Sequence, residues 1–201
     1  MESNFGERCD EHLKGGGYDV PANHKELLTV SDAAKYSALE LLRNGLRIEI
    51  RALKISDRAD LVAAVDHTSA RSLYRRFFSL KRHFSEKEIN FFLNIDFANH
   101  VALVAVVREG GRRAIVGGGR YVVVRPGTAE VAFTVVDKYQ GQGIGGSLMR
   151  HLTTLARDAG LKELIAEVLP ENIPMLKVFE NSWLRYSAKL EDGVVNVSLQ
   201  L

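Results

Sequence analysis

The chain has 201 residues, with 27 lysines and arginines against 25 aspartates and glutamates, and so a formal net charge of +2. This length leaves room for one full domain plus an appendage and excludes two large domains. A hydrophobic share of 46% and a charged share of 26% are ordinary for a globular protein and exclude wholesale disorder. The single cysteine, Cys9, excludes an internal disulfide. No cysteine–histidine cluster has zinc-site spacing, so we expect no metal.

The N-terminus and the hydropathy pattern predict a cytoplasmic protein. Residues 1–10 are acidic and polar, unlike a signal peptide, and no apolar run approaches the ~18 residues of a membrane-spanning helix. We therefore expect no membrane partner. Residues 1–45 carry 5 basic and 8 acidic side chains, and residues 46–201 carry 22 and 17. This basic excess favours anionic ligands but is too small for a nucleic-acid-binding domain, so we expect no nucleic acid partner.

The first 45 residues are predicted to be a flexible tail followed by one helix. Residues 1–24 contain three consecutive glycines and little apolar content, which is typical of flexible chain. Ser31 has the chemistry of a helix N-cap, and Asn44-Gly45 that of a helix end. The sequence therefore predicts a helix from Ser31 to about Arg43 that docks on a domain beginning at residue 46.

From residue 46 onward, the pattern predicts an α/β protein with a mixed sheet. Leu46, Ile48 and Ile50 alternate with polar residues, as in a strand, a capping box Ser85-x-x-Glu88 opens one helix, and glycines mark the turns. The predicted elements, in chain order, are a strand from 46, helices over 57–67, 69–78 and 86–94, strands over 100–107, 114–124 and 129–136, a helix to about 159, a strand over 162–169, a helix over 172–182, and a hairpin over 184–190 and 194–201. This order indicates a sheet with an antiparallel first half.

A glycine-rich loop over 139–146 is the most informative segment of the chain. It connects a strand to a helix and has four glycines in six residues. Glycines let successive backbone N–H groups turn inward together, and a helix N-terminus carries about half a positive charge. A tight turn alone would need one glycine, so the loop is predicted to bind a pyrophosphate.

Parts of this loop also fit a dinucleotide-binding motif. Its glycines satisfy G-x-G-x-x-G, and Glu167 follows about 20 residues later, as in such a domain. Against this interpretation, four residues separate Val136 from Gly141, and 34 residues follow Glu167, too few for the further parallel units. A P-loop is excluded because Ser147 stands where the motif requires lysine. A nucleotide-binding module thus stays an alternative to be tested.

The same stretch also fits the pattern Val136-x-x-x-Gln140-x-x-Gly143-x-Gly145. This motif resembles the acyl-coenzyme A signature of the GNAT N-acetyltransferase superfamily, and the element order over 46–201 is similar to that fold. Four runs are similar to the catalytic domain of bacterial protein lysine acetyltransferases of the Pat type: Arg51-Ala-Leu-Lys-Ile-Ser-Asp57, Ser72-Leu-Tyr-Arg-Arg-Phe-Phe-Ser79, His100-Val-Ala-Leu-Val104 and Ala129-Glu-Val-Ala-Phe133. The resemblance implies a GNAT fold over 46–201 and acetyl-CoA as the cofactor.

The resemblance also implies which residues contact the cofactor. The pantetheine arm is expected to pair with the strand that ends at Val136, with the oxyanion held by backbone N–H groups around Val135. A local bulge is expected to splay this strand from the one over 162–169. The expected cofactor-binding residues are Thr134, Val135, Val136, Gln140, Gly141, Gln142, Gly143, Ile144, Gly145, Gly146, Ser147, Asn172 and Phe179. Phe179 stands where many relatives carry a tyrosine that acts as general acid, and Tyr186 is a candidate substitute.

Acyl transfer from a thioester requires a neutral amine as nucleophile. A lysine with a pKa of ~10.4 is only about 0.04% neutral at pH 7, a deficit of roughly 4–5 kcal/mol. Glu130 lies at the start of the strand that leads into the loop, and its neighbours are apolar. Because glutamate is disfavoured in strands, its presence there favours a catalytic role. In GNAT protein acetyltransferases a glutamate at this place acts as general base through a water. We expect Glu130 to be that base; the alternative is a solvent-facing strand carboxylate.

These inferences predict an enzyme that moves an acetyl group from acetyl-CoA directly to a primary amine. The expected acceptor is the ε-amine of a protein lysine, and a small-molecule amine is the alternative. A non-catalytic acyl-CoA sensor is an alternative function. Arg75 and Arg76, beside the acceptor site of this fold, are expected to guide an acidic substrate. The sequence leaves the oligomeric state open, with a homodimer among the options.

Overall fold

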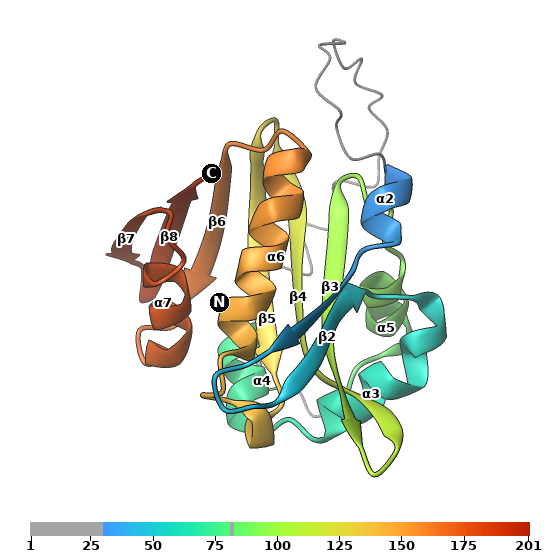
Figure 1. Ribbon diagram of the computed structural model, residues 1–201. Coiled ribbons are helices and arrows are strands. Elements are labelled where there is room, and N and C mark those ends of the chain that lie inside the picture. The colour runs from blue at the N-terminus through green and yellow to red at the C-terminus, as the bar shows by residue number, and fades with distance from the viewer. Residues whose placement is uncertain (1–29, 81–82) are drawn as a thin grey trace.

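The computed structural model describes residues 30–80 and 83–201, which form an eight-stranded mixed sheet with helices on both faces (Figure 1). The strands are β1 (Ser37–Leu41), β2 (Arg47–Ala52), β3 (His100–Glu109), β4 (Arg112–Arg125), β5 (Thr128–Val135), β6 (Glu163–Val168), β7 (Arg185–Glu191) and β8 (Val194–Gln200). The helices are α2 (Val30–Ala34), α3 (Arg58–Asp66), α4 (Ala70–Phe77), α5 (Glu86–Leu93), α6 (Ile144–Asp158) and α7 (Ile173–Glu180), with short 3-10 turns η1 (Ile55–Asp57) and η2 (Asp137–Tyr139). None of the described helices is both long and apolar enough to span a bilayer.

The strands lie in the order β1-β2-β3-β4-β5-β6-β8-β7, and every neighbouring pair is antiparallel except β5 and β6. Local signals account for most elements. Ser69 caps α4 by accepting the N–H of Ser72, and Ser85 with Glu88 forms the predicted capping box of α5. The predicted α/β class, with a mixed sheet whose first half is antiparallel, is confirmed.

The N-terminal part of the described chain differs from the prediction. A helix from Ser31 to about Arg43 is wrong, because α2 ends at Ala34 and the residues from Ser37 to Leu41 form β1. β1 pairs with β2 and so extends the sheet beyond its predicted start. Alanine, leucine and glutamate favour helices, but pairing with β2 and contacts with α6 outweigh this local preference. The predicted flexible tail over 1–24 lies outside the described residues.

Apolar side chains pack on both faces of the sheet. On one face, α6 lies along the central strands and α7 lies beside it, where the rings of Phe133 and Phe179 meet edge-to-face with centroids 6.0 Å apart (Figure 1). On the other face, Ile89 and Leu93 of α5 join a second cluster with Leu53. Helix α4 also packs on this second face, against β5, so α4 and α7 approach β5 from opposite sides.

Candidate active site

Strands β5 and β6 separate from one another partway along the sheet. Their parallel ladder has three pairs, from Thr128↔Glu163 to Glu130↔Ile165, and beyond these the strands diverge. A cleft of about 670 Å³ occupies the gap and is lined by both strands, α4, the glycine-rich loop and α7. The predicted splay is therefore confirmed. The expected bulge is wrong, because the β5 ladder to β4 keeps its register from Ala129 to Val135.

The edge of β5 beside the cleft presents backbone hydrogen-bonding groups. The N–H of Val136 donates to the carbonyl of Val116 at 2.9 Å, which makes Val135, opposite Gly117, a non-hydrogen-bonded position of the antiparallel ladder. The N–H and C=O groups of Val135, and of Phe133 two residues earlier, therefore point away from β4 toward the cleft. An extended ligand that carries amides can pair with this edge as an added strand does.

The glycine-rich loop forms one end of the cleft and continues into α6. Gly141 and Gly143 have φ angles of 71° and 94°, which glycine adopts without strain. A Cβ at Gly145 would lie 3.3 Å from Val178 of α7, so close helix packing explains this glycine. A Cβ at Gly146 would meet no protein atom within 4 Å, although Gly146 lines the cleft. The close approach of a ligand explains that glycine better than the fold does.

The N-terminus of α6 has the properties of an anion site. The helix has 15 residues, and its N-cap, Gly143, provides no side-chain cap. The N–H groups of the first turn have no acceptor within a helix, and the helix dipole adds partial positive charge at this end. Because these groups border the cleft, a phosphate group can bind there.

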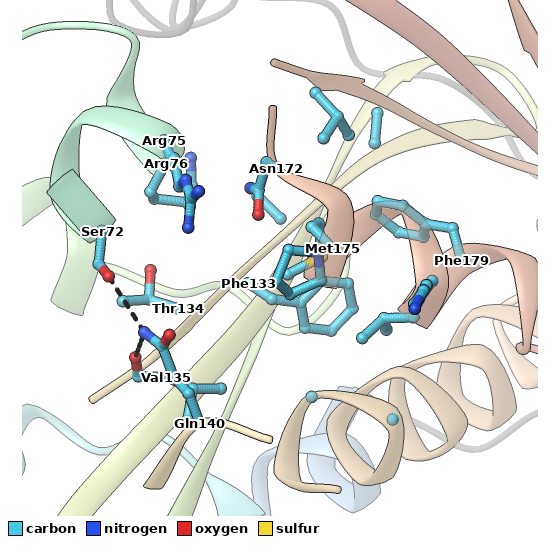
Figure 2. A pocket seen from close by; sticks show the side chains of 18 of the residues that line it. Ser72, Arg75, Arg76, Phe133, Thr134, Val135, Gln140, Asn172, Met175 and Phe179 are labelled. Carbon is cyan, nitrogen blue, oxygen red and sulfur yellow. Dashed lines mark hydrogen bonds between the residues drawn. The ribbon is translucent and has the colours of Figure 1, made fainter. Parts of the chain in front are cut away.

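Hydrogen bonds fasten α4 to the loop (Figure 2). Gln140 Nε2 donates to the carbonyl of Val135 at 2.9 Å and to Ser72 Oγ at 3.1 Å. Asp137 accepts from Ser72 Oγ at 3.0 Å, and from the N–H and hydroxyl of Ser69, both at 2.7 Å. Partial burial raises the pKa of Asp137, but these hydrogen bonds outweigh it and hold the pKa below its usual value. Sequence reasoning missed Ser72 and Asp137 as partners, because 65 residues separate them.

Glu130 lines the cleft at the point where β5 and β6 begin to part. Burial lowers the pKa of Arg76 on α4 to about 10, and attraction to Glu130 opposes that shift. The Arg76 guanidinium is therefore close enough to the Glu130 carboxylate for the two charges to attract one another. Arg75 donates from Nη2 to the carbonyl of Glu171 at 3.2 Å, which links α4 to the segment before α7. Figure 2 shows both arginines next to Asn172, with the arginines on α4 and Asn172 on the segment that leads into α7.

The remaining predicted site residues fall into two groups. Those that line the cleft are Glu130, Thr134, Val135, Gln140, Gly141, Gly143, Ile144, Gly145, Gly146, Asn172 and Phe179. Three others lie outside its lining. Val136 packs in the core, Gln142 accepts a hydrogen bond from Asn44, and Ser147 donates its hydroxyl to Glu40 at 2.5 Å. These three side chains therefore contact other parts of the protein and do not border the cleft.

Neither of the two positions expected to supply a general acid presents a tyrosine hydroxyl to the cleft. Phe179 is buried and packs on Phe133, so its position offers the cleft a ring without a hydroxyl. Tyr186 lies on β7, outside the cleft lining, and its position argues against the hypothesis that it acts as the acid. Tyr139 lines the cleft, but its hydroxyl donates to Glu109. Within the described residues, no cluster of histidine, cysteine or carboxylate side chains is placed to hold a metal ion.

A sheet that opens between two parallel strands, with amides on one edge and an anion site at the adjoining helix, defines an acyltransferase of the acyl-coenzyme A class. The chain belongs to the acetyltransferase (GNAT) family, whose model matches residues 67–182. The predicted superfamily, fold and enzyme class are thereby confirmed.

Relatives with known names place the chain near the Pat type within this family. Acetyltransferase Pat of Mycolicibacterium smegmatis is 36% identical over 124 residues, which are 58% of this chain and 36% of that protein. An acetyltransferase of Pseudomonas aeruginosa is 32% identical over 127 residues, which are 63% of this chain and 68% of that protein. The solved GNAT domain of S. lividans PAT superposes with a TM-score of 0.75 and 34% identity, over 82% of this chain and 97% of that domain. The chain thus spans about a third of the mycobacterial Pat.

Proposed function

We propose that this protein transfers the acetyl group of acetyl-CoA directly to a primary amine, with a protein lysine as acceptor and Glu130 as general base. The cleft between β5 and β6 carries the proposal, because it joins an anion site, a backbone edge and a carboxylate. GNAT enzymes use acetyl-CoA, in which phosphates, amides and a thioester follow one another along the molecule. Their order is that of the anion site, the backbone edge and the carboxylate along the cleft. In the transfer, the neutral amine nitrogen bonds to the acetyl carbon, the carbon–sulfur bond breaks, and the amine proton leaves to the base. Coenzyme A leaves as a thiolate, which takes a proton from water to become the free thiol.

The residues of the cleft fit this coenzyme. The first turn of α6 would hold the pyrophosphate, where Gly146 leaves room for it. The β5 edge at Val135 would pair with the pantetheine amides, and the cleft-facing N–H groups of Phe133 and Val135 would stabilise negative charge on the thioester oxygen. Gln140 supports this arrangement, because its side chain ties the Val135 carbonyl to α4.

Glu130 is suited to remove the proton through a water. It lies three residues before Phe133, a Cα separation of about 10 Å at ~3.3 Å per strand residue. A carboxylate at that distance reaches an amine near the Phe133 N–H when one water lies between them. The positive charge of Arg76 attracts this carboxylate. The base would offset the roughly 4–5 kcal/mol needed to neutralise a lysine amine at pH 7.

Likeness to the Pat type supports a protein lysine as the acceptor, in a cytoplasmic setting. Arg75 and Arg76 of α4 line the cleft, and their positive charge would favour a lysine with acidic neighbours. Incubating the full chain with isotope-labelled acetyl-CoA and a cell extract, followed by mass spectrometry, tests the acceptor. Label on protein lysines is expected. Label confined to small amines would show that the protein acceptor is wrong.

Replacing Glu130 by glutamine tests the base. We expect turnover of the acceptor so identified to fall by about 10²–10⁴-fold at pH 7, with a smaller loss at high pH, where more of the amine is already neutral. Affinity for coenzyme A should stay the same. Glu167→Gln is the matched control, because Glu167 also lines the cleft but lies on β6. Unchanged turnover of Glu130→Gln would remove Glu130 from the mechanism, and no turnover by the wild type would favour an acyl-CoA sensor.

A further inference from the structure

A second, smaller cavity adjoins the cleft on the face of the sheet that α3 and α4 cover. Its volume is about 80 Å³. Arg76, Ala132 and Thr134 line both the cleft and this cavity, so the two spaces are neighbours that share these side chains. The remaining lining is largely apolar and comes from α3, β3 and β4. Its further polar side chains are Thr68, whose hydroxyl donates to the carbonyl of Ala64, and Arg120, whose Nη1 lies 3.0 Å from His100 Nε2.

Three consecutive glycines, at positions 117–119, lie in the middle of β4 beside this cavity. Glycine weakens the interior of a strand and calls for a reason. A Cβ at Gly119 would lie 2.6 Å from the ring of Phe133, and a Cβ at Gly117 would lie 3.2 Å from Ile144 and from the Thr134 carbonyl. Close packing on the α6 side of the sheet therefore explains these two glycines.

Gly118 has no such explanation in the fold. The nearest atom to a Cβ there is the carbonyl oxygen of Leu103 at 3.6 Å, an ordinary contact, and its φ is not positive. Side chains alternate between the faces of a strand, so a side chain at 118 would point to the face opposite that of 117 and 119. That face holds the small cavity, which Gly118 lines. Because residue 118 has no side chain, the part of the cavity that a side chain would occupy stays open.

We infer that this cavity receives the far end of the acyl group and that Gly118 sets the longest chain it accepts. The inference rests on the proposed acyl transfer in the neighbouring cleft. A thioester carbonyl at the Phe133 N–H would lie beside Ala132, which lines both spaces, so an acyl chain that extends past this short side chain would reach the cavity. An apolar cavity of about 150 Å³ takes up the six carbons of benzene, so this cavity has room for about three. The expected substrates are acyl-CoA thioesters up to about three carbons longer than acetyl.

The size of the effect follows from the apolar surface that the chain buries. Butyryl-CoA carries two methylenes more than acetyl-CoA, and each buried methylene contributes about 0.8 kcal/mol. The wild type should therefore bind butyryl-CoA up to about 15-fold more tightly than acetyl-CoA. Gly118→Val places three carbons in the cavity and should abolish this preference. Gly118→Ala places one there and should reduce it by an intermediate amount.

Isothermal titration of the full-length wild type, Gly118→Ala and Gly118→Val with coenzyme A, acetyl-CoA, propionyl-CoA and butyryl-CoA tests the inference. The affinities for coenzyme A and acetyl-CoA should agree within about twofold among the three proteins. Thermal unfolding controls for folding, and valine is favoured in strands, so the melting temperature should not fall. If Gly118→Val fails to fold, the alanine variant decides by itself.

Two different failures can be told apart. If the wild type binds neither acetyl-CoA nor coenzyme A, the proposed function fails. If it binds acetyl-CoA, but the ratio of butyryl-CoA to acetyl-CoA affinity is the same in all three proteins, the acyl pocket alone is overturned. If Gly118 variants keep the same ratio of butyryl-CoA to acetyl-CoA affinity and instead change which acceptor amines are used, that result would also overturn the acyl pocket and would assign the cavity to the acceptor.

Discussion

Replacing Glu40 of β1 tests whether this N-terminal strand stabilises the sheet that carries the cleft. Its carboxylate accepts hydrogen bonds from Ser147 Oγ at 2.5 Å and Arg150 Nη2 at 2.7 Å, and lies 2.7 Å from His151 Nε2. All three partners belong to the first turns of α6, the helix whose N-terminus borders the cleft. Replacing Glu40 by glutamine keeps the size of the side chain and removes the charge that these partners surround.

The pKa of Glu40 gives the expected magnitude. Burial raises this pKa, but hydrogen bonds from Ser147, Arg150 and His151 outweigh it and lower the value from 4.5 to about 2. A lower pKa in the folded state stabilises the protein above pH 4.5, and this contribution is lost as the pH falls toward 2. The shift corresponds to at most about 3 kcal/mol at pH 7 and about 1 kcal/mol at pH 3. The side chain is 19% exposed, so solvent screening reduces both values.

Urea unfolding of the wild type and Glu40→Gln at pH 7 and pH 3 measures this contribution. We expect the variant to be less stable by about 2–3 kcal/mol at pH 7 and by about 1 kcal/mol or less at pH 3, with unchanged m-values. Glu180→Gln is the control, because that carboxylate is exposed on α7, and its effect should stay within about 0.5 kcal/mol. A Glu40→Gln protein as stable as the wild type at pH 7, or a difference that does not narrow in acid, would refute the reasoning.

Two further substitutions probe the anion site and the core. Gly146→Val should lower affinity for coenzyme A by about tenfold or more without lowering the melting temperature, because a Cβ at this position has open space beside the cleft and valine is a better helix former than glycine. Titration calorimetry measures this, and unchanged affinity would remove the helix N-terminus from the site. Asp57→Asn should destabilise the fold by about 3 kcal/mol in urea unfolding, because it leaves the buried Arg51 guanidinium without the carboxylate it contacts at 2.6 and 2.8 Å. A loss below about 1 kcal/mol would contradict the account of this pair.

The sequence by itself determined the elements whose signals are local. The hydroxyl caps at Ser69 and Ser85 lie three residues from the N–H groups they accept, and the loop glycines adopt their positive φ angles within a few residues of α6. Alternating apolar residues likewise marked β2, and apolar runs between turn residues marked β3 to β5. These signals sufficed for the α/β class, the order of elements and the glycine-rich motif on which the family resemblance rests.

Tertiary structure decided the features that depend on partners distant in the chain. The residues of β1 favour a helix locally and become a strand because β2 and α6 hold them, Glu40 and Ser147 being 107 positions apart. Asp137 and Ser72 fix α4 beside the loop, and the parting of β5 and β6 after Glu130 opens the cleft. A linear sequence does not encode such contacts in its spacing, because they arise only when packing brings separate elements together. The site is therefore a product of the fold, built around a loop that the sequence already identifies.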